Sequence, residues 1–252
     1  MNLVFASGFL VPQRIFGLDY FRDLPARFPQ ALFPKVAVDG QIKNRALKLA
    51  AQIKECFPEG QIHIIAHSMG GLDARYLLSS NLLGLAPRVA SLSTVSTPHR
   101  GSPIADLLLG LLPGIDSASV RKVLDGFPAV QSGALDCLTT AFANRFNQET
   151  PNVSSVRYLS YFGCGDISVA LHPTHDFIAS RAHTEEERAN DGVVSMASAV
   201  WPSELVEPAW PADHLAQIGH NLDTLDLRTT FDHKSAFDRV VQRAIGAAAS
   251  SD

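Results

Sequence analysis

The stretch Ile62-His63-Ile64-Ile65-Ala66-His67-Ser68-Met69-Gly70-Gly71-Leu72 decides the fold of this chain. An apolar run ends abruptly in a turn of small and polar residues, and a helix-like segment follows from Leu72 to Leu78. This order predicts a strand, a sharp turn and a helix, with Ser68 at the tip of the turn. A serine hydroxyl is a weak nucleophile, so it must stand clear of the backbone where a histidine can take its proton. The alternative interpretation is an ordinary glycine-rich turn on a buried strand.

Strand-like apolar runs alternate with segments of helical periodicity along the rest of the chain. Continuous apolar runs are typical of parallel strands that are covered on both faces. The alternation therefore predicts an α/β fold with a mostly parallel, doubly wound sheet. The predicted strands are 2–6, 35–38, 61–66, 89–95, 156–161 and 204–207, and the predicted helices are 42–57, 72–83, 135–146 and 235–248.

The 252 residues contain no repeat and no charge-rich linker, so we expect a single domain over 1–252. A helical insertion is predicted over about 102–151, because this segment is too rich in leucine for a surface loop. It has two interpretations. It could be a helical pair packed on the sheet, or a lid whose apolar underside covers a site and meets a lipid surface when open.

Composition excludes several classes of protein. Apolar residues make up 46% and charged residues 18%, which is typical of a globular chain. The net charge of −4 gives no reason to expect a nucleic-acid partner, and no apolar run is long enough to predict a transmembrane segment. The first ten residues lack a basic segment and a cleavage site, so they predict a first strand and not a signal peptide. A mature secreted form stays open.

A nucleophilic serine needs a histidine and an acid, which this kind of fold supplies in the order Ser, Asp or Glu, His. Asp191 is the best candidate for the acid, because it lies in a turn between an acidic stretch and an apolar run. An unremarkable Asn-Asp-Gly turn is the alternative. The base must follow, and His214, His220 and His233 are the histidines after Asp191. The loop position of His214, after a strand and before a short helix, favours it over the other two.

A developing oxyanion needs two backbone N–H groups that already point at it. The residue after the nucleophile, Met69, should supply one of them. The second should come from the loop after the first strand, where Phe9 follows Ser7 and Gly8. We therefore predict an oxyanion hole built from Phe9 and Met69.

With these residues assembled, the chain resembles the bacterial true lipases of the Pseudomonas and Burkholderia type, within the α/β-hydrolase superfamily. The likeness spans nearly the whole length. It rests on segments 7–9, 66–71, 75–76, 96–102, 145–147 with Pro151, 190–194 and 213–215. The resemblance implies a serine carboxylic ester hydrolase, a lipase or esterase, with Ser68 as nucleophile, Asp191 as acid and His214 as base. It also implies a lipid-like or other ester substrate, transient contact with a lipid interface and no cofactor.

The chain departs from that family at its calcium site and its disulfide. Ala216 stands where the family has one calcium-binding aspartate, and the other would fall near His172 or Pro173. Since a hard cation needs several oxygen ligands, we predict no calcium of that kind. Cys56, Cys137 and Cys164 do not match the family's disulfide and predict packing residues. These two absences lean weakly towards an intracellular protein.

Some alternatives stay open at this point. His172, His175, Asp176 and His183 could bind zinc or form a merely polar loop. His63 and His67 flank a strand and are interpreted as packing or hydrogen-bonded groups. The same triad could serve a thioesterase or a polyester depolymerase, and a dead hydrolase fold could act as a binding protein.

Overall fold

The computed structural model describes residues 1–8, 14–15, 18–36, 40–114, 118, 120 and 133–246. The strands are β1 Asn2–Ala6, β2 Arg14–Ile15, β3 Leu18–Asp19, β4 Ile62–His67, β5 Val89–Val95, β6 Arg157–Tyr161 and β7 Leu205–Val206. The α-helices are α1 Leu24–Arg27, α2 Ile42–Cys56, α3 Gly70–Ser79, α4 Pro103–Leu108, α6 Thr140–Glu149, α7 His172–Ser180, α8 Glu185–Arg188, α9 Met196–Ala199 and α10 His233–Gly246. Short 3₁₀ turns are η1 Leu82–Gly84, η2 Ala86–Arg88, η4 Leu135–Leu138, η5 Val169–Leu171 and η6 Ala216–Ile218.

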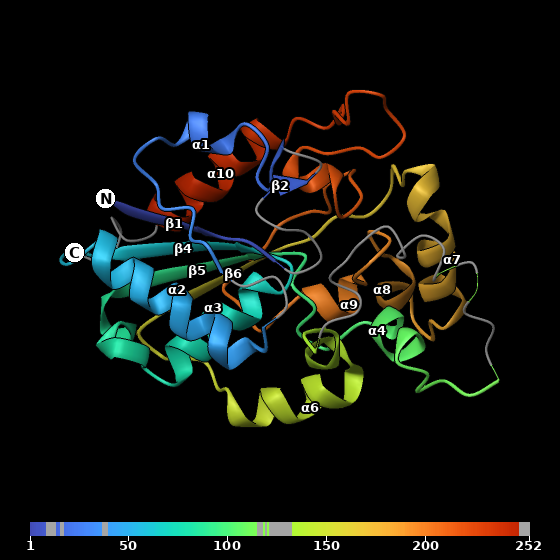
Figure 1. The fold of residues 1–252 in the computed structure, drawn as a ribbon, viewed down its shortest axis with the longest axis horizontal. Coiled ribbons are helices and arrows are strands. Elements are labelled where there is room, and N and C mark those ends of the chain that lie inside the picture. Colours follow the sequence, from blue (N-terminus) through green and yellow to red (C-terminus); the bar gives the residue numbers. More distant parts are fainter. Residues whose placement is uncertain are drawn as a thin grey trace.

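The main sheet has five strands in the order β1-β4-β5-β6-β7, and each neighbouring pair is parallel. The β4 strand lies between β1 and β5, so Ile65 faces Phe5 on one side and Ser93 on the other. Parallel strands need crossover connections, and the helices between the strands provide them (Figure 1). The predicted parallel α/β sheet is confirmed.

Alternate residues of the strands build two separate cores. Phe5 and Ile65 pack with Phe237 of α10 on one face of the sheet. Val4 and Ile64 pack with the leucines and alanines of α2 and α3 on the other face. Because side chains alternate along a strand, a sheet buried on both faces must be apolar at successive positions, as β4 is. Each fully buried Ile contributes about 1.5–3 kcal/mol to stability. Helices therefore cover both faces of the sheet.

The predicted strand over 35–38 is wrong for Lys35 and Val36, which are not in a strand, and residues 37–38 lie outside the described residues. Leu32 takes that place instead, since its N–H donates to Leu3 O and its carbonyl accepts from Phe5 N–H. The backbone N–H and C=O of Lys35 bond to the Gln52 side-chain amide of α2. The apolar pattern near residue 36 thus reflects packing against α2, which a parallel edge strand imitates in sequence.

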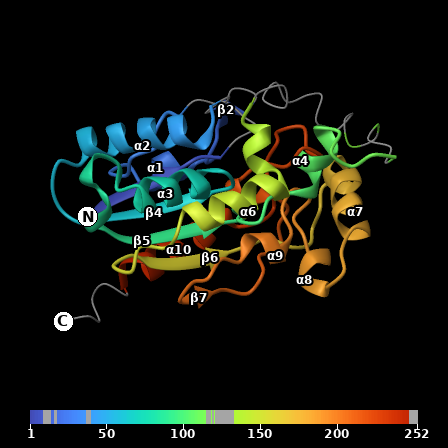
Figure 2. The same cartoon turned by 90° about the horizontal axis from the view of Figure 1, so that it is seen from below.

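The helices α4, α7 and α8 lie beyond the carboxyl ends of the strands (Figure 2). The described part of segment 102–151 buries several apolar residues, among them Ile104, Leu107 and Leu135, in a cluster with Met69 and Leu72. The predicted helix over 135–146 is interrupted at Thr139, whose extended backbone and side-chain hydroxyl cap the start of α6. This part of the insertion therefore packs directly on the turn that holds Ser68.

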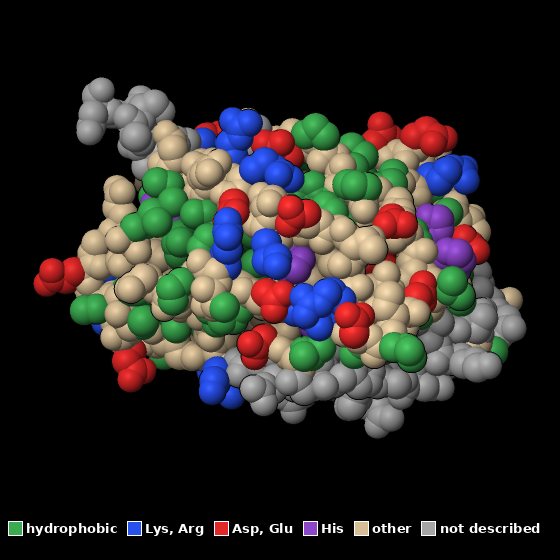
Figure 3. Space-filling model, turned by 90° about the horizontal axis from the view of Figure 1, so that it is seen from above, with side chains coloured by type: hydrophobic (Ala, Val, Ile, Leu, Met, Phe, Trp, Pro, Cys, Tyr) green, Lys and Arg blue, Asp and Glu red, His purple; other side chains and the backbone are tan. Residues whose placement is uncertain are grey.

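On the face shown in Figure 3, acidic and basic side chains lie interspersed among the coloured residues. A nucleic-acid site requires a basic patch or stripe, and this face carries none among those residues. In the described part of the chain, no helix is long and apolar enough to cross a bilayer.

Gly71→Ala is expected to destabilise the fold by about 1–3 kcal/mol, because the site has no room for a methyl group. A Cβ at Gly71 would lie 2.7 Å from Thr97 Cγ2 and 2.9 Å from Thr97 Cβ. Thermal unfolding measures the effect. Gly246→Ala is the control, since Gly246 also lies in a helix but nothing lies within 4 Å of the added atom. Equal stability of the two variants would contradict the close approach of α3 and the 96–102 loop.

Candidate active site

Ser68 occupies the turn between β4 and α3, at the carboxyl edge of the sheet. Its φ of 56° is in the left-handed region, which is costly for a residue other than glycine. Its N–H donates to Val95 O of the neighbouring strand at 2.9 Å, which holds the turn in place. A Cβ at Gly70 would lie 2.8 Å from Ser7 O, so this glycine lets α3 pass close to the end of β1. The predicted strand, sharp turn and helix are all present.

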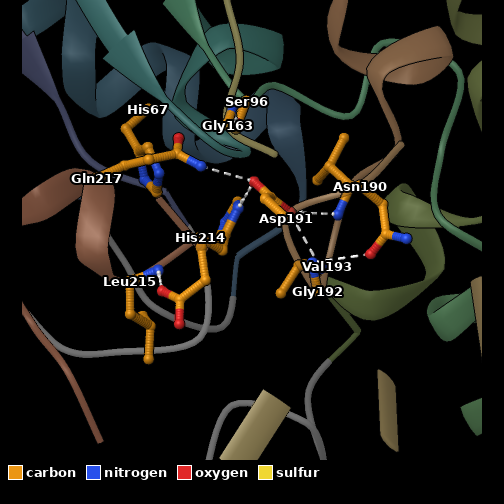
Figure 4. Close-up of polar contacts among 12 residues, drawn as sticks. His67, Ser96, Gly163, Asn190, Asp191, Gly192, Val193, His214, Leu215 and Gln217 are labelled. Carbon is orange, nitrogen blue, oxygen red and sulfur yellow. Dashed lines mark hydrogen bonds and ion pairs between the residues drawn. The ribbon is translucent and has the colours of Figure 1, made fainter. Parts of the chain in front are cut away.

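Asp191 and His214 form a buried pair at the same edge of the sheet. His214 Nδ1 and Asp191 Oδ2 are 2.8 Å apart, and both side chains are almost fully inaccessible to solvent (Figure 4). Asp191 Oδ1 accepts from the N–H groups of Val193 and Val194 at 3.0 and 2.7 Å. The Gln217 amide also donates to Asp191 Oδ2 at 2.9 Å. These contacts and a further hydrogen bond from the Ser96 side chain fix the acid candidate.

These donors decide the charge of Asp191. Burial alone would raise the pKa of its carboxyl group. The neighbouring His214 and hydrogen bonds from His214, Val194 and Ser96 outweigh burial, so the pKa of Asp191 is lowered from its ordinary value. Asp191 is therefore a carboxylate at neutral pH and can fix the tautomer of the His214 ring.

The other two candidate bases engage backbone carbonyls elsewhere. His220 Nε2 lies 3.0 and 3.1 Å from the carbonyls of Asp19 and Tyr20. His233 Nε2 lies 2.9 Å from Arg22 O. Each ring nitrogen that makes such a contact is a donor, since a carbonyl only accepts. His214 is the candidate base whose ring contacts Asp191.

The loop after β1 lies directly against the candidate nucleophile. A Cβ at Gly8 would lie 2.5 Å from Ser68 Cβ and 3.0 Å from Ser68 Oγ, so only a glycine leaves room for the serine here. Arg45 of α2 holds this loop from behind, donating to Ser7 O at 3.0 Å and to Gly8 O at 3.2 Å. Phe9, one predicted oxyanion residue, lies outside the described residues. Met69, the other, is fully buried where α3 begins.

Arg45 is itself buried, in an ion pair with Asp73 of α3 at 2.8 Å. Burial raises the pKa of Asp73 to about 6, although Arg45 opposes the shift. This pair joins α2, α3 and the loop at residues 7–8 in one network. Breaking it by removing one partner would leave a buried charge uncompensated.

The residues that the family uses for calcium do not fit a cation here. Asp213, three residues before Ala216, accepts hydrogen bonds from the backbone N–H groups of Ser168, Leu215 and Ala216. Those contacts use the oxygens that a cation would need. Across the described residues, no group of three His, Cys, Asp or Glu side chains is arranged to hold a metal, and His175 pairs with Asp176 at the surface.

EDTA is expected to leave the melting temperature of the purified protein unchanged, because these oxygen donors are already committed to backbone groups. Differential scanning calorimetry with and without the chelator measures this. A drop in melting temperature that added Ca²⁺ reverses would overturn the prediction.

Several residues around the pair carried no sequence signal of their own. Tyr20 contacts His67, and both Gln217 and Ser96 contact Asp191. The interpretation of His63 and His67 as hydrogen-bonded groups is confirmed, since His63 bonds to Ser91 and His67 to Tyr20. No local spacing marks these residues, because each contact joins positions far apart in the sequence.

Comparison with known proteins finds sequence similarity to proteins named triacylglycerol lipases. A triacylglycerol lipase 2 of Saccharomyces cerevisiae is 34% identical over 178 residues, which cover 66% of this chain and 51% of the yeast protein. A triacylglycerol lipase of Vibrio cholerae is 25% identical, covering 86% of this chain and 78% of that protein. A triacylglycerol lipase of Pseudomonas fragi is 29% identical, covering 71% of this chain and 69% of that protein. The chain thus spans about half the length of the yeast relative.

Solved structures share the fold. The mature lipase BlEst2 of Bacillus licheniformis has a TM-score of 0.71 at 19% identity, covering 96% of this chain and 91% of that one. The lipase of Staphylococcus hyicus has a TM-score of 0.70 at 16% identity, covering 100% and 97%. A metagenomic carboxyl esterase, MGS0156, has a TM-score of 0.75 at 21% identity, and the match covers 98% of this chain and 76% of that one. No family model matches the chain.

Proposed function

We propose that the chain is a serine carboxylic ester hydrolase that acts on acyl esters of lipid character. Its sequence resembles bacterial triacylglycerol lipases, and it shares the fold of lipases and esterases. The observation that carries the proposal is the buried Asp191–His214 pair at the same sheet edge as the strained Ser68 turn. No cofactor enters the reaction.

The proposed reaction has two halves. His214 takes the proton of Ser68 as its oxygen attacks the acyl carbonyl, and Asp191 stabilises the imidazolium that forms. The N–H groups of Met69 and Phe9 hold the negative oxygen of the tetrahedral intermediate. His214 then gives the proton to the leaving alcohol, which leaves an acyl-enzyme. Water activated by His214 hydrolyses that intermediate and frees Ser68.

The segment 102–151 is proposed to cover this site as a lid and to contact lipid transiently. Its described residues form an apolar cluster with Met69 and Leu72, on the helix that follows Ser68. Leu111 is 54% exposed in the same segment, as an interfacial residue would be. Arg75 ties the end of the segment to α3, since it donates to Asn147 Oδ1 and Thr150 O at 2.9 and 3.0 Å.

Hydrolysis of p-nitrophenyl esters of increasing chain length, with and without emulsified triglyceride, tests the proposal. We expect long acyl chains to be preferred and the rate to rise at the oil–water interface, because the cluster beside Ser68 is apolar. Preference for short soluble esters with no interfacial gain would make 102–151 a fixed wall and the protein an esterase. Thioesters and polyesters in the same panel test the two alternative acyl donors. Inactivity on every acyl donor would contradict the proposal.

A further inference from the structure

Three buried side chains link the oxyanion loop to the acid. Tyr20, His67 and Gln217 are 5%, 0% and 0% exposed, and each contacts a different part of the site. The Tyr20 hydroxyl lies 2.7 Å from His67 Nδ1 and is also hydrogen-bonded by the Gly8 backbone N–H. The Gln217 amide nitrogen donates to Asp191 Oδ2 at 2.9 Å. The set therefore begins at Gly8 and ends at the carboxylate that faces His214.

The donors and acceptors of this set have one consistent direction. Tyr20 accepts from Gly8, and we assign its own proton to His67 Nδ1, which lies 2.7 Å from the hydroxyl oxygen. A neutral imidazole with Nδ1 as acceptor carries its proton on Nε2. Burial lowers the pKa of His67 well below its ordinary value, which keeps the ring neutral. The buried Nε2–H of His67 therefore requires a hydrogen-bond acceptor.

Gln217 offers that acceptor. Its amide nitrogen is committed to Asp191, so its Oε1 atom is left to accept. In the described part of the chain, His67 Nε2 and Gln217 Oε1 are both buried without a hydrogen bond of normal geometry. The His214 carbonyl and, to a smaller extent, the Gln217 side chain raise the pKa of the His67 ring against the effect of burial, and Figure 4 shows the His67 and Gln217 side chains next to each other. The contact is a loose one in this structure.

His67 also contacts the candidate base directly. The centroids of the His67 and His214 rings are 4.6 Å apart, with the planes tilted by 44°. The His67 ring thus supports one side of the His214 ring, while Asp191 holds its Nδ1 edge. A neutral His67 can do so without repelling the imidazolium that forms during turnover.

We propose that Tyr20, His67 and Gln217 form a directional hydrogen-bond relay, Gly8 to Tyr20 to His67 to Gln217 to Asp191, that positions the oxyanion loop and the acid–base pair relative to each other. These are positioning residues, and the inference rests on the proposed ester hydrolase function. It also assigns the Gly8 N–H to Tyr20. In the proposed relay each donor is directed towards the Asp191 charge, so the bonds would strengthen one another.

A double-mutant cycle between residues that do not share a hydrogen bond tests the relay. Tyr20→Phe and Gln217→Met should each lower kcat about tenfold and leave KM within about twofold, since positioning acts on the transition state. The double variant should lose little more than the worse single variant, because each change already breaks the same chain. Losses that multiply, or a wild-type kcat in Tyr20→Phe, would overturn the relay.

Tyr161→Phe is the matched control. Its hydroxyl is also buried but has no hydrogen-bond partner among the described residues. This variant should keep the wild-type kcat. Added to Gln217→Met, it should leave kcat at the value of Gln217→Met alone. Melting temperatures of all variants separate lost positioning from lost folding, since a folding defect reduces active enzyme without changing the pH profile or KM.

A second measurement does not depend on activity. The imidazole ¹⁵N spectrum of the labelled wild-type protein should show His67 neutral with its proton on Nε2 at neutral pH, assigned by its loss in His67→Gln. A proton on Nδ1, or an imidazolium, would overturn the relay. Failure of wild-type protein to show Ser68-dependent ester hydrolysis would sink the proposed function alone, because the tautomer still reports on the relay.

Discussion

Ser68→Ala is expected to reduce ester hydrolysis by about 10⁴–10⁶-fold in kcat while the protein stays folded. The hydroxyl of Ser68 is the one that the turn presents beside Gly8, and alanine has no nucleophile to replace it. Alanine meets the same left-handed backbone as serine at this position, where φ is 56°, so the substitution adds little strain. Initial rates on a p-nitrophenyl ester, with active-site titration by a serine-directed phosphonate, measure the loss.

Ser93→Ala is the matched control for this experiment. Ser93 lies on β5 in the same sheet, and its hydroxyl is buried without a hydrogen-bond partner among the described residues. This variant should keep wild-type turnover and one phosphonate label per chain. Turnover by Ser68→Ala close to that of Ser93→Ala would remove Ser68 from the mechanism, whatever the resemblance to lipases.

The sequence predicted most of the sheet, because buried parallel strands are continuously apolar. Residues 2–6 and 89–95 are strands with the predicted ends, and β4 begins and ends one residue later than predicted. The prediction failed at Lys35 and Val36, where apolar residues pack beside α2 and Leu32 bonds to β1. Periodicity reports burial, and burial against a helix gives the same apolar pattern as burial in a strand.

The candidate site was predictable where chemistry fixes residue types in a fixed order. Ser68, Asp191 and His214 follow that order, and the structure puts Asp191 and His214 in contact. Tyr20 and Gln217 could not be found in this way, because they act through hydrogen bonds set by tertiary packing. Tyr20 meets His67 across 47 residues of sequence and Gln217 meets Asp191 across 26, so no local spacing encodes them.

The choice of His214 over two other histidines leads to the second large expected effect. His214→Ala should lower kcat by about 10⁴–10⁶-fold, because the proposed mechanism makes His214 the acceptor of the Ser68 proton. It also removes the partner of Asp191 Oδ2, leaving a buried carboxylate with the Gln217 and backbone donors. Some loss of stability should accompany the loss of activity, since that charge stays buried. Rates on a p-nitrophenyl ester and thermal unfolding measure both.

The controls are His220→Gln and His233→Gln, which keep a donor for the backbone carbonyls that these rings contact. Both histidines are buried, so the substitutions should lower the melting temperature while activity per folded molecule stays mostly intact. His214→Ala should show the largest loss of turnover per folded molecule, whereas the two controls should mainly show a lower melting temperature. A loss of turnover in either control comparable to that of His214→Ala would transfer the role of base to that histidine, and the Asp191–His214 contact would then be structural.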